Sequence, residues 1–179
     1  MRSLRYLNVD HNYIQTIPAS IGECVELREL RLAHNSCTTL PKSIGSLRNL
    51  HYLDVSHCGL TAVPQELGNL TGLTVLKLRG NALHIVPVSL GALKSLTLLD
   101  LVSNPLRSDM ADKFEESRST PDLFIAFLAS VQRAGAYTPL CTAHGSGIAP
   151  EGMRPLEPVT LSVIAVDYAG DRKHMGGDP

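Results

Sequence analysis

Apolar residues recur along the first two-thirds of the chain with a step of 23 positions. One column of this pattern consists of leucines only: Leu7, Leu30, Leu53, Leu76 and Leu99. A proline column and a glycine column keep the same step: Pro18, Pro41, Pro64 and Pro87, then Gly22, Gly45, Gly68 and Gly91. A fixed period of roughly 20 to 50 residues is typical of solenoids, whose units bury an apolar side only by stacking on one another. The pattern therefore predicts five stacked units over residues 1–106.

Each unit divides into a short strand, a turn and a return segment. In the second unit these are residues 30–32, the bend at Asn35 and residues 40–45. The side chains expected in the core share one register, which in the first unit reads Leu4, Leu7, Val9, Ile14, Ile17 and Ile21. We expect one asparagine column to bond backbone groups in the bends: Asn12, Asn35, Asn81 and Asn104. The proline column fixes φ in the return segment, and we expect the glycine column to adopt a backbone conformation closed to other residues.

The motif L-x-x-L-x-L-x-x-N and the segment L-P-x-x-I/L-G-x-L at residues 40–47 and 86–93 resemble a known family. They are similar to the typical 23-residue leucine-rich repeats of intracellular scaffold proteins, including the Ras-associated scaffold group. The resemblance implies an α/β solenoid, a horseshoe of short parallel strands. It is specific for the fold and weakly specific for function, because the matching positions are structural.

Both ends of the repeat array carry information. The chain opens directly on a repeat strand, so we expect core side chains of the first unit to be exposed and Met1 not to be the start of the natural array. At the other end we expect a C-terminal helical cap over residues 107–134, with Thr120 as N-cap, Pro121 in the first turn and Asp122 favourable to the helix dipole. Its predicted apolar face has helical spacing: Leu123, Phe124, Phe127, Leu128 and Val131.

Residues 135–179 form a glycine- and proline-rich segment that contains an alternating apolar run at 159–166. The sequences at 141–148, 158–170 and 176–179 resemble the opening of a filamin-type immunoglobulin repeat. That resemblance implies a linker and an incomplete β segment, with the first two or three strands of a sandwich of about seven. The alternative is a glycine/proline tail with one chance strand.

The side chains that flank the strand leucines form the surface that we call the concave face. One of its columns reads Asn8, Arg31, Asp54, Lys77 and Asp100, which predicts a ladder of neighbouring ion pairs. One interpretation is a solvated surface on which the charges only pair with one another. The other is a surface that sets the register of a charged partner. Tyr6 and Tyr52 share another column, with Glu29 between them, and suit a partner hot spot. The candidate partner-binding residues are Tyr6, Glu29, Arg31, Tyr52, Asp54, Lys77 and Arg79.

A further column begins with His11, His34 and His57. Three histidines on adjacent rungs suggest a metal or pH-sensing site, but surface positions copied with the repeat are the favoured interpretation, so no metal and no cofactor are predicted. Cys24 and Cys37 occupy core positions and Cys58 stands in the asparagine column, which argues against a disulfide framework. The sequence has no G-x-S-x-G elbow, P-loop, H-E-x-x-H or dinucleotide fingerprint, so no enzyme activity is predicted.

The net charge of -1 gives no general attraction to nucleic acid, so we do not predict nucleic-acid binding. The sequence has no long apolar run and no apolar leader, so we do not predict membrane insertion. We expect a cytoplasmic, non-catalytic protein–protein interaction module of a scaffold, or of a cytoskeletal or flagellar protein. The alternative is the recognition arm of a larger enzyme: a kinase, a GTPase or a ubiquitin ligase. A third possibility is an architectural element that packs against neighbours in a large assembly.

Overall fold

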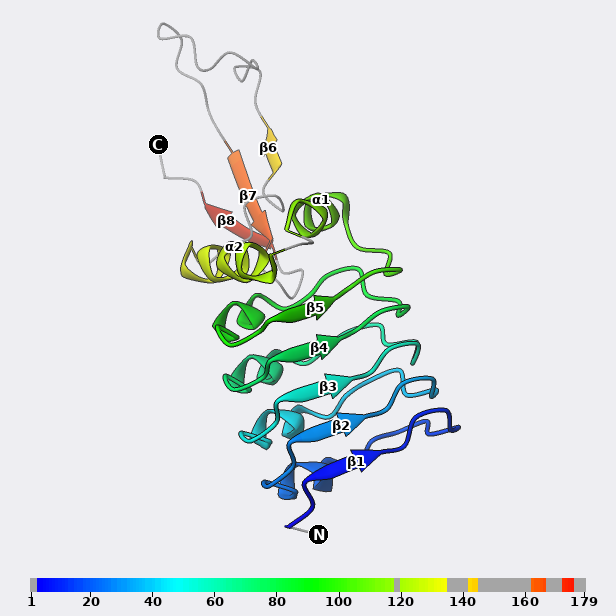
Figure 1. Ribbon diagram of the computed structural model, residues 1–179. Coiled ribbons are helices and arrows are strands. Elements are labelled where there is room, and N and C mark those ends of the chain that lie inside the picture. Colours follow the sequence, from blue (N-terminus) through cyan, green and yellow to red (C-terminus); the bar gives the residue numbers. More distant parts are fainter. Residues whose placement is uncertain (1–2, 118–119, 135–141, 145–161, 167–171, 176–179) are drawn as a thin grey trace, which may run out of the picture. The chain divides into compact units, whose positions relative to one another are not determined.

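The computed structural model describes residues 3–117, 120–134, 142–144, 162–166 and 172–175. The chain divides into two compact units, Met1–Ser130 and Val131–Pro179. In the first unit, five strands of three residues form one parallel sheet in chain order (Figure 1): β1 (Tyr6–Asn8), β2 (Glu29–Arg31), β3 (Tyr52–Asp54), β4 (Val75–Lys77) and β5 (Leu98–Asp100). The predicted α/β solenoid of short parallel strands is confirmed.

The register of the sheet follows the 23-residue step of the sequence. Leu7 pairs with Leu30, Leu30 with Leu53, and the same step continues to Leu76 and Leu99. The central leucine of β2, β3 and β4 is fully buried, while the residues on either side of it are half-buried. Each strand therefore points one side chain into the core and two toward the concave face.

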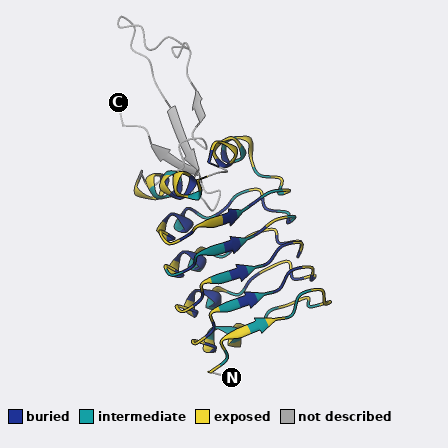
Figure 2. Cartoon of the chain, viewed as in Figure 1, coloured by how far each residue is buried: buried dark blue, intermediate teal, exposed yellow. Residues whose placement is uncertain are grey.

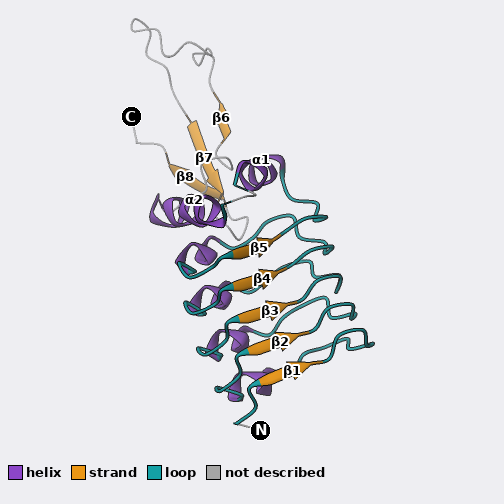
Figure 3. Cartoon of the chain, viewed as in Figure 1, coloured by secondary structure: helices purple, strands orange, loops and turns teal. Residues whose placement is uncertain are grey.

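The return segments form 3-10 turns on the opposite side of the sheet (Figure 3). These turns are η1 (Ala19–Glu23), η2 (Lys42–Ser46), η3 (Gln65–Asn69) and η4 (Val88–Ala92). A proline of the predicted column precedes each turn, with φ between −67° and −70°. Proline holds φ at this value, so it positions the start of every turn as predicted.

The expectation that the glycines of the repeated column adopt a backbone conformation closed to other residues is wrong. Among the described glycines only Gly59 and Gly80 have a positive φ, and neither belongs to that column. A Cβ atom on Gly45 would lie 2.4 Å from the backbone oxygen of Glu66 in the next turn, and one on Gly68 would lie 2.3 Å from that of Ser89. The column is glycine because adjacent rungs approach too closely for a side chain.

The asparagine column bonds the backbone of two rungs at once, as predicted. Asn81 Nδ2 donates to the carbonyl oxygens of Val55 (2.9 Å) and Leu78 (2.8 Å), and its Oδ1 accepts from the N–H groups of Cys58 and Leu60. One rung later, Asn104 Nδ2 donates to the carbonyl oxygens of Leu78 and Leu101, and its Oδ1 accepts from the N–H of Leu83. These bonds satisfy backbone groups that stacking removes from water.

The first rung is more exposed than the others, as expected (Figure 2). Leu4, Leu7 and Ile14 are half-buried, whereas their equivalents Leu27, Leu30 and Cys37 are fully buried. The three described cysteines, Cys24, Cys37 and Cys58, are free and buried. Cys141 lies outside the described residues.

The helices α1 (Ser108–Glu116) and α2 (Pro121–Ala134) follow β5, the last strand of the parallel sheet. A Cβ atom on Gly91 of η4 would lie 2.4 Å from the backbone nitrogen of Ala129, so α2 packs closely on the last turn. The predicted apolar face was partly wrong, because Leu123 is 60% exposed and Ile125 is buried in its place. Phe124 contacts Phe114 of α1 edge to face, with ring centroids 5.7 Å apart, and both rings are buried.

Among the described residues of the second unit, three short strands pair antiparallel in the order β6 (Thr142–His144), β7 (Ser162–Val166) and β8 (Arg172–Met175). β7 lies within the alternating run that predicted a strand at 159–166. The turn at 145–148 and the segment 176–179, which support the filamin-type resemblance, lie outside the described residues.

Candidate functional site

The concave face brings together the residues predicted for partner binding. Tyr6 pairs with Glu29 and Glu29 with Tyr52, so these three form one column across β1, β2 and β3. Arg31, Asp54 and Lys77 form the neighbouring column on β2, β3 and β4. The seventh predicted residue, Arg79, follows β4 by two positions, and Tyr6 stands at the open edge of the sheet.

Tyr52 lies at the centre of this face between two cations from the flanking strands. The guanidinium carbon of Arg31 is 4.8 Å from the centroid of the Tyr52 ring, and Nζ of Lys77 is 5.4 Å from it. A cation within about 6 Å of an aromatic face is attracted by the ring quadrupole. The three side chains therefore support one another and hold the Tyr52 ring in place.

The predicted ladder of ion pairs is mostly wrong. Lys77 and Asp54 do pair across strands, at 3.7 Å. Arg31 instead pairs with Glu29 of its own strand, and Asp100 pairs with Arg79 at 3.9 Å. Long side chains reach partners two residues away as easily as across a rung, which the column pattern alone does not reveal.

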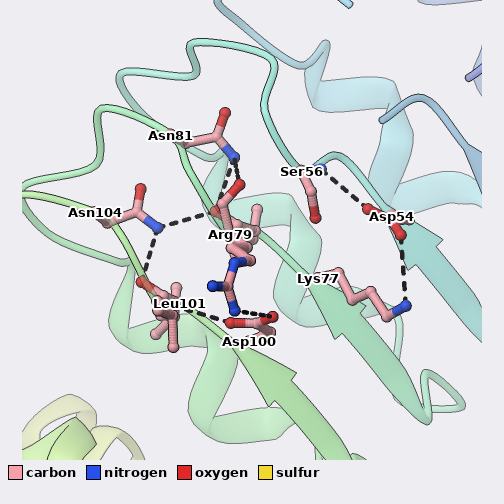
Figure 4. Close-up of polar contacts among 10 residues, drawn as sticks. Asp54, Ser56, Lys77, Arg79, Asn81, Asp100, Leu101 and Asn104 are labelled. Carbon is pink, nitrogen blue, oxygen red and sulfur yellow. Dashed lines mark hydrogen bonds and ion pairs between the residues drawn. The ribbon is translucent and has the colours of Figure 1, made fainter. Parts of the chain in front are cut away.

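Two carboxylates of this face, Asp54 and Asp100, accept hydrogen bonds from backbone N–H groups (Figure 4). Asp54 Oδ1 accepts a hydrogen bond from the N–H of Ser56 at 3.0 Å, and Asp100 Oδ1 accepts one from Val102 at 3.1 Å. Asn8, in the same column, makes the equivalent bond to the N–H of Asp10. These short polar side chains cap the ends of β1, β3 and β5, so Asp54 and Asp100 have a structural role in addition to their charge.

Hydrogen bonds raise the pKa of both cations beside Tyr52. The hydrogen bond to Glu29 raises the pKa of Arg31 above its ordinary value. Hydrogen bonding with Tyr52, with a smaller contribution from the charge of Asp54, raises the pKa of Lys77. Both side chains are charged at neutral pH, because the ordinary pKa values of arginine and lysine already lie far above 7.

The histidine column lies just beyond the strands, in the left-handed backbone region. His11, His34 and His57 have φ of 56°, 56° and 54°, and their rings stack in parallel at centroid distances of 4.4 and 4.6 Å. The nitrogen lone pairs of parallel rings do not converge on one point. In the part of the chain that the structure describes, no group of three or more histidine, cysteine, aspartate or glutamate side chains could hold a metal ion.

Leu98 and Asp100 also lie on this face, although they are not among the predicted site residues. Leu98 continues the Tyr6 column onto β5 and is 41% exposed, and Asp100 pairs with Arg79. The step of 23 from Val75 and Lys77 contained the signal for both positions.

A family model described as a leucine-rich repeat region matches residues 1–120. The chain belongs to the leucine-rich-repeat family. Domains of this family are in general protein-interaction modules. No curated protein sequence gives a significant match.

Solved leucine-rich-repeat structures share this fold. A leucine-rich-repeat protein of Leptospira interrogans is 38% identical with a TM-score of 0.62, and the match covers 68% of this chain and 30% of that one. The Arabidopsis receptor kinase HAESA, solved in complex with the peptide hormone IDA and a co-receptor, is 36% identical with a TM-score of 0.53, covering 57% and 18%. The leucine-rich-repeat domain of the type III effector XopL is 28% identical with a TM-score of 0.55, covering 59% and 38%.

This leucine-rich-repeat chain spans less than two-fifths of the length of each of these proteins. Among the residues that the structure describes, no helix combines the length and apolar character needed to cross a membrane.

Proposed function

We propose that this chain is a non-catalytic protein-interaction module that binds a protein partner on its concave face. The observation that carries the proposal is the cluster around Tyr52, in which a half-buried aromatic ring lies between Arg31 and Lys77. Tyrosine and arginine are enriched among the residues that dominate binding energy at protein interfaces. A ring already held in place loses little conformational freedom when a partner docks.

The class of partner is supported by two structural neighbours. HAESA was solved with the peptide hormone IDA, and the plant peptide hormone receptor RGFR1, 30% identical with a TM-score of 0.54, was solved with RGF2. A peptide or an extended protein segment is therefore a suitable partner for a face of this architecture.

Our leading hypothesis for the whole protein is a cytoplasmic scaffold, or a cytoskeletal or flagellar component. It is supported by the resemblance of the repeats to Ras-associated scaffold proteins and of residues 137–179 to a filamin-type repeat. The alternative is the recognition arm of a larger enzyme, which the match to a receptor kinase favours. A catalytic domain encoded beside this sequence would decide for the alternative.

An affinity capture with mass spectrometry tests the proposed face. The test variant combines Tyr52→Ala with Arg79→Glu. Arg79 is chosen because its side chain is 50% exposed. Asp54 is left unchanged because its carboxylate accepts a hydrogen bond from the backbone N–H of Ser56. The matched control combines Asn69→Ala with Lys42→Glu on exposed positions of the 3-10 turns. We expect a partner that the wild type and the control capture and the test variant loses. Equal capture by all three proteins would exclude the concave face.

A further inference from the structure

The cations of the concave face stand further out than the carboxylates beside them. The side chain of Lys77 is 35% exposed against 13% for its partner Asp54, and that of Arg79 is 50% exposed against 26% for Asp100. The formal charges of the two pairs cancel, but an approaching molecule meets the positive groups first.

The carboxylates of these pairs already accept hydrogen bonds from other groups of the protein, and their cation partners do not hydrogen-bond to them. Asp54 accepts hydrogen bonds from Ser56 N–H and the Tyr52 hydroxyl, and Asp100 accepts one from Val102 N–H. The distances from Lys77 to Asp54 (3.7 Å) and from Arg79 to Asp100 (3.9 Å) are too long for hydrogen bonds. Within the described part of the chain, the guanidinium of Arg79 thus makes an ion pair but no hydrogen bond, so its N–H donors stay available.

From these observations we infer that the concave face recognises an acidic peptide segment, whose carboxylates bond Lys77 and Arg79 while its backbone or a side chain packs on Tyr52. The inference rests on the proposed function and names the chemistry of the partner. Arginine and lysine donors bound to carboxylates make hydrogen bonds roughly twice as strong as neutral ones. Lys77 ends β4 and Arg79 follows it by two positions, so the two cations belong to one rung. An extended peptide places alternate side chains on one side, roughly 6.6 Å apart, so a peptide running along this rung can direct two carboxylates to the two cations.

A nucleic acid fits this face less well than a peptide. Glu29, Asp54 and Asp100 stand on β2, β3 and β5, so a continuous row of phosphates crossing the sheet would meet carboxylates on three of its five strands. The whole chain carries a net charge of -1, which gives no general attraction to polyanions. A peptide, in contrast, can place its carboxylates at separated positions.

Fluorescence anisotropy with three labelled probes tests the inference: a decapeptide of alternating glutamate and serine, a decapeptide of alternating lysine and serine, and a ten-nucleotide single-stranded DNA. One variant combines Lys77→Gln with Arg79→Gln. The other combines Asp54→Asn with Asp100→Asn, which removes two charges and keeps the backbone cap, as Asn8 does in the same column. Both variants should keep the circular dichroism spectrum of the wild type.

We expect the acidic peptide to bind the wild type more tightly than the other probes do and to lose affinity as salt is added. Its Kd should rise roughly tenfold in the lysine–arginine variant and fall several-fold in the double asparagine variant. Preference for the basic peptide or the DNA, or no binding of the acidic peptide at millimolar concentration, would overturn the inference. A partner captured through Tyr52 but indifferent to neutralisation of Lys77 and Arg79 would overturn it too, while leaving the proposed function intact.

Discussion

At the scale of single residues, the 3-10 turns contain a hydrogen bond that one rung lacks. Ser43 Oγ donates to the carbonyl oxygen of Ala19, and Ser89 Oγ donates to that of Gln65, both at 2.6 Å. Glu66 occupies the same column between these serines, and its Oε2 is buried without a hydrogen-bond partner. A carboxylate cannot donate the bond that serine makes, so this rung is less well connected to its neighbour.

Replacing Glu66 with serine should therefore stabilise the protein. We expect Glu66→Ser to raise the free energy of unfolding by about 1 kcal/mol, since it supplies one hydrogen bond and removes a poorly solvated carboxylate. Urea denaturation followed by circular dichroism measures the change. Glu66→Ala removes the carboxylate without adding a donor, and an equal gain in both variants would show that the hydrogen bond contributes nothing.

A second residue-scale prediction concerns Cys58, whose thiol is buried and donates to the carbonyl oxygen of Leu32 at 3.1 Å. Burial raises the pKa of Cys58 from 9.0 to about 12. The folded state favours the protonated thiol, so the contribution of Cys58 to stability is complete below pH 9 and is lost as pH rises toward 12.

Because the thiolate is the reactive form, Cys58 should resist alkylation by iodoacetamide at pH 9.5 in the folded protein. It should react fully in 8 M urea. Peptide mapping by mass spectrometry resolves this site from the other cysteines. Rapid alkylation of Cys58 without denaturant would contradict the buried position of the thiol.

At the scale of elements, the segment after each strand of the parallel sheet contains one residue in the left-handed backbone region, and these residues are 23 positions apart. His11, His34, His57, Gly80 and Ser103 occupy these positions, with φ between 54° and 66°. The His57 ring extends over the next rung, where a Cβ atom on Gly80 would lie 2.3 Å from its Nδ1. Gly80 therefore serves two purposes: it adopts a positive φ and it leaves room for the last ring of the stack.

These two purposes can be separated with a matched pair of substitutions. Gly59 also has a positive φ, of 78°, but a Cβ there would meet nothing within 4 Å. Gly59→Ala should cost about 1 to 2 kcal/mol from backbone strain alone. Gly80→Ala should cost more, and it should shift the NMR signals of the imidazole ring of His57. Equal costs with an unchanged His57 spectrum would show that the stack does not depend on Gly80.

At the scale of the whole molecule, the two ends of the described stack of repeats differ in how well their core side chains are covered. α2 packs on η4 at the C-terminal end, whereas the first rung leaves Leu4, Leu7 and Ile14 half-buried. Solenoid stability is approximately a sum of repeat terms and neighbour terms, and among the described residues β1 pairs with β2 alone. Side chains of the same column should therefore differ in their contribution to stability.

The leucine column allows a direct measurement of this difference. Leu53→Ala, at a fully buried position of β3, should lower the free energy of unfolding by about 3 kcal/mol. Leu7→Ala, at the half-buried equivalent of β1, should cost less than half of that, since less apolar surface and no closed cavity are involved. Urea denaturation gives both values. Equal costs would mean that the first rung is as well covered in solution as the third.

Much of this fold was predictable because the same residue types recur at equivalent positions in each repeat. The step of 23 predicted the strands, the register of Leu7 with Leu30, the proline before each 3-10 turn and the bonds of Asn81 and Asn104. It also placed the predicted site residues on one face, because parallel strands in constant register align equivalent positions.

The sequence by itself determined the solenoid, its core and the composition of the concave face, since these depend only on spacing and residue type. The tertiary structure decided which partner each charged side chain reaches, because Arg31 and Asp100 find closer partners than the column suggests. It also decided why the glycines of the turns are required, because the distance between rungs is a property of packing. The stacking of three imidazole rings above Gly80 likewise follows from backbone dihedral angles and side-chain packing that no column of letters contains.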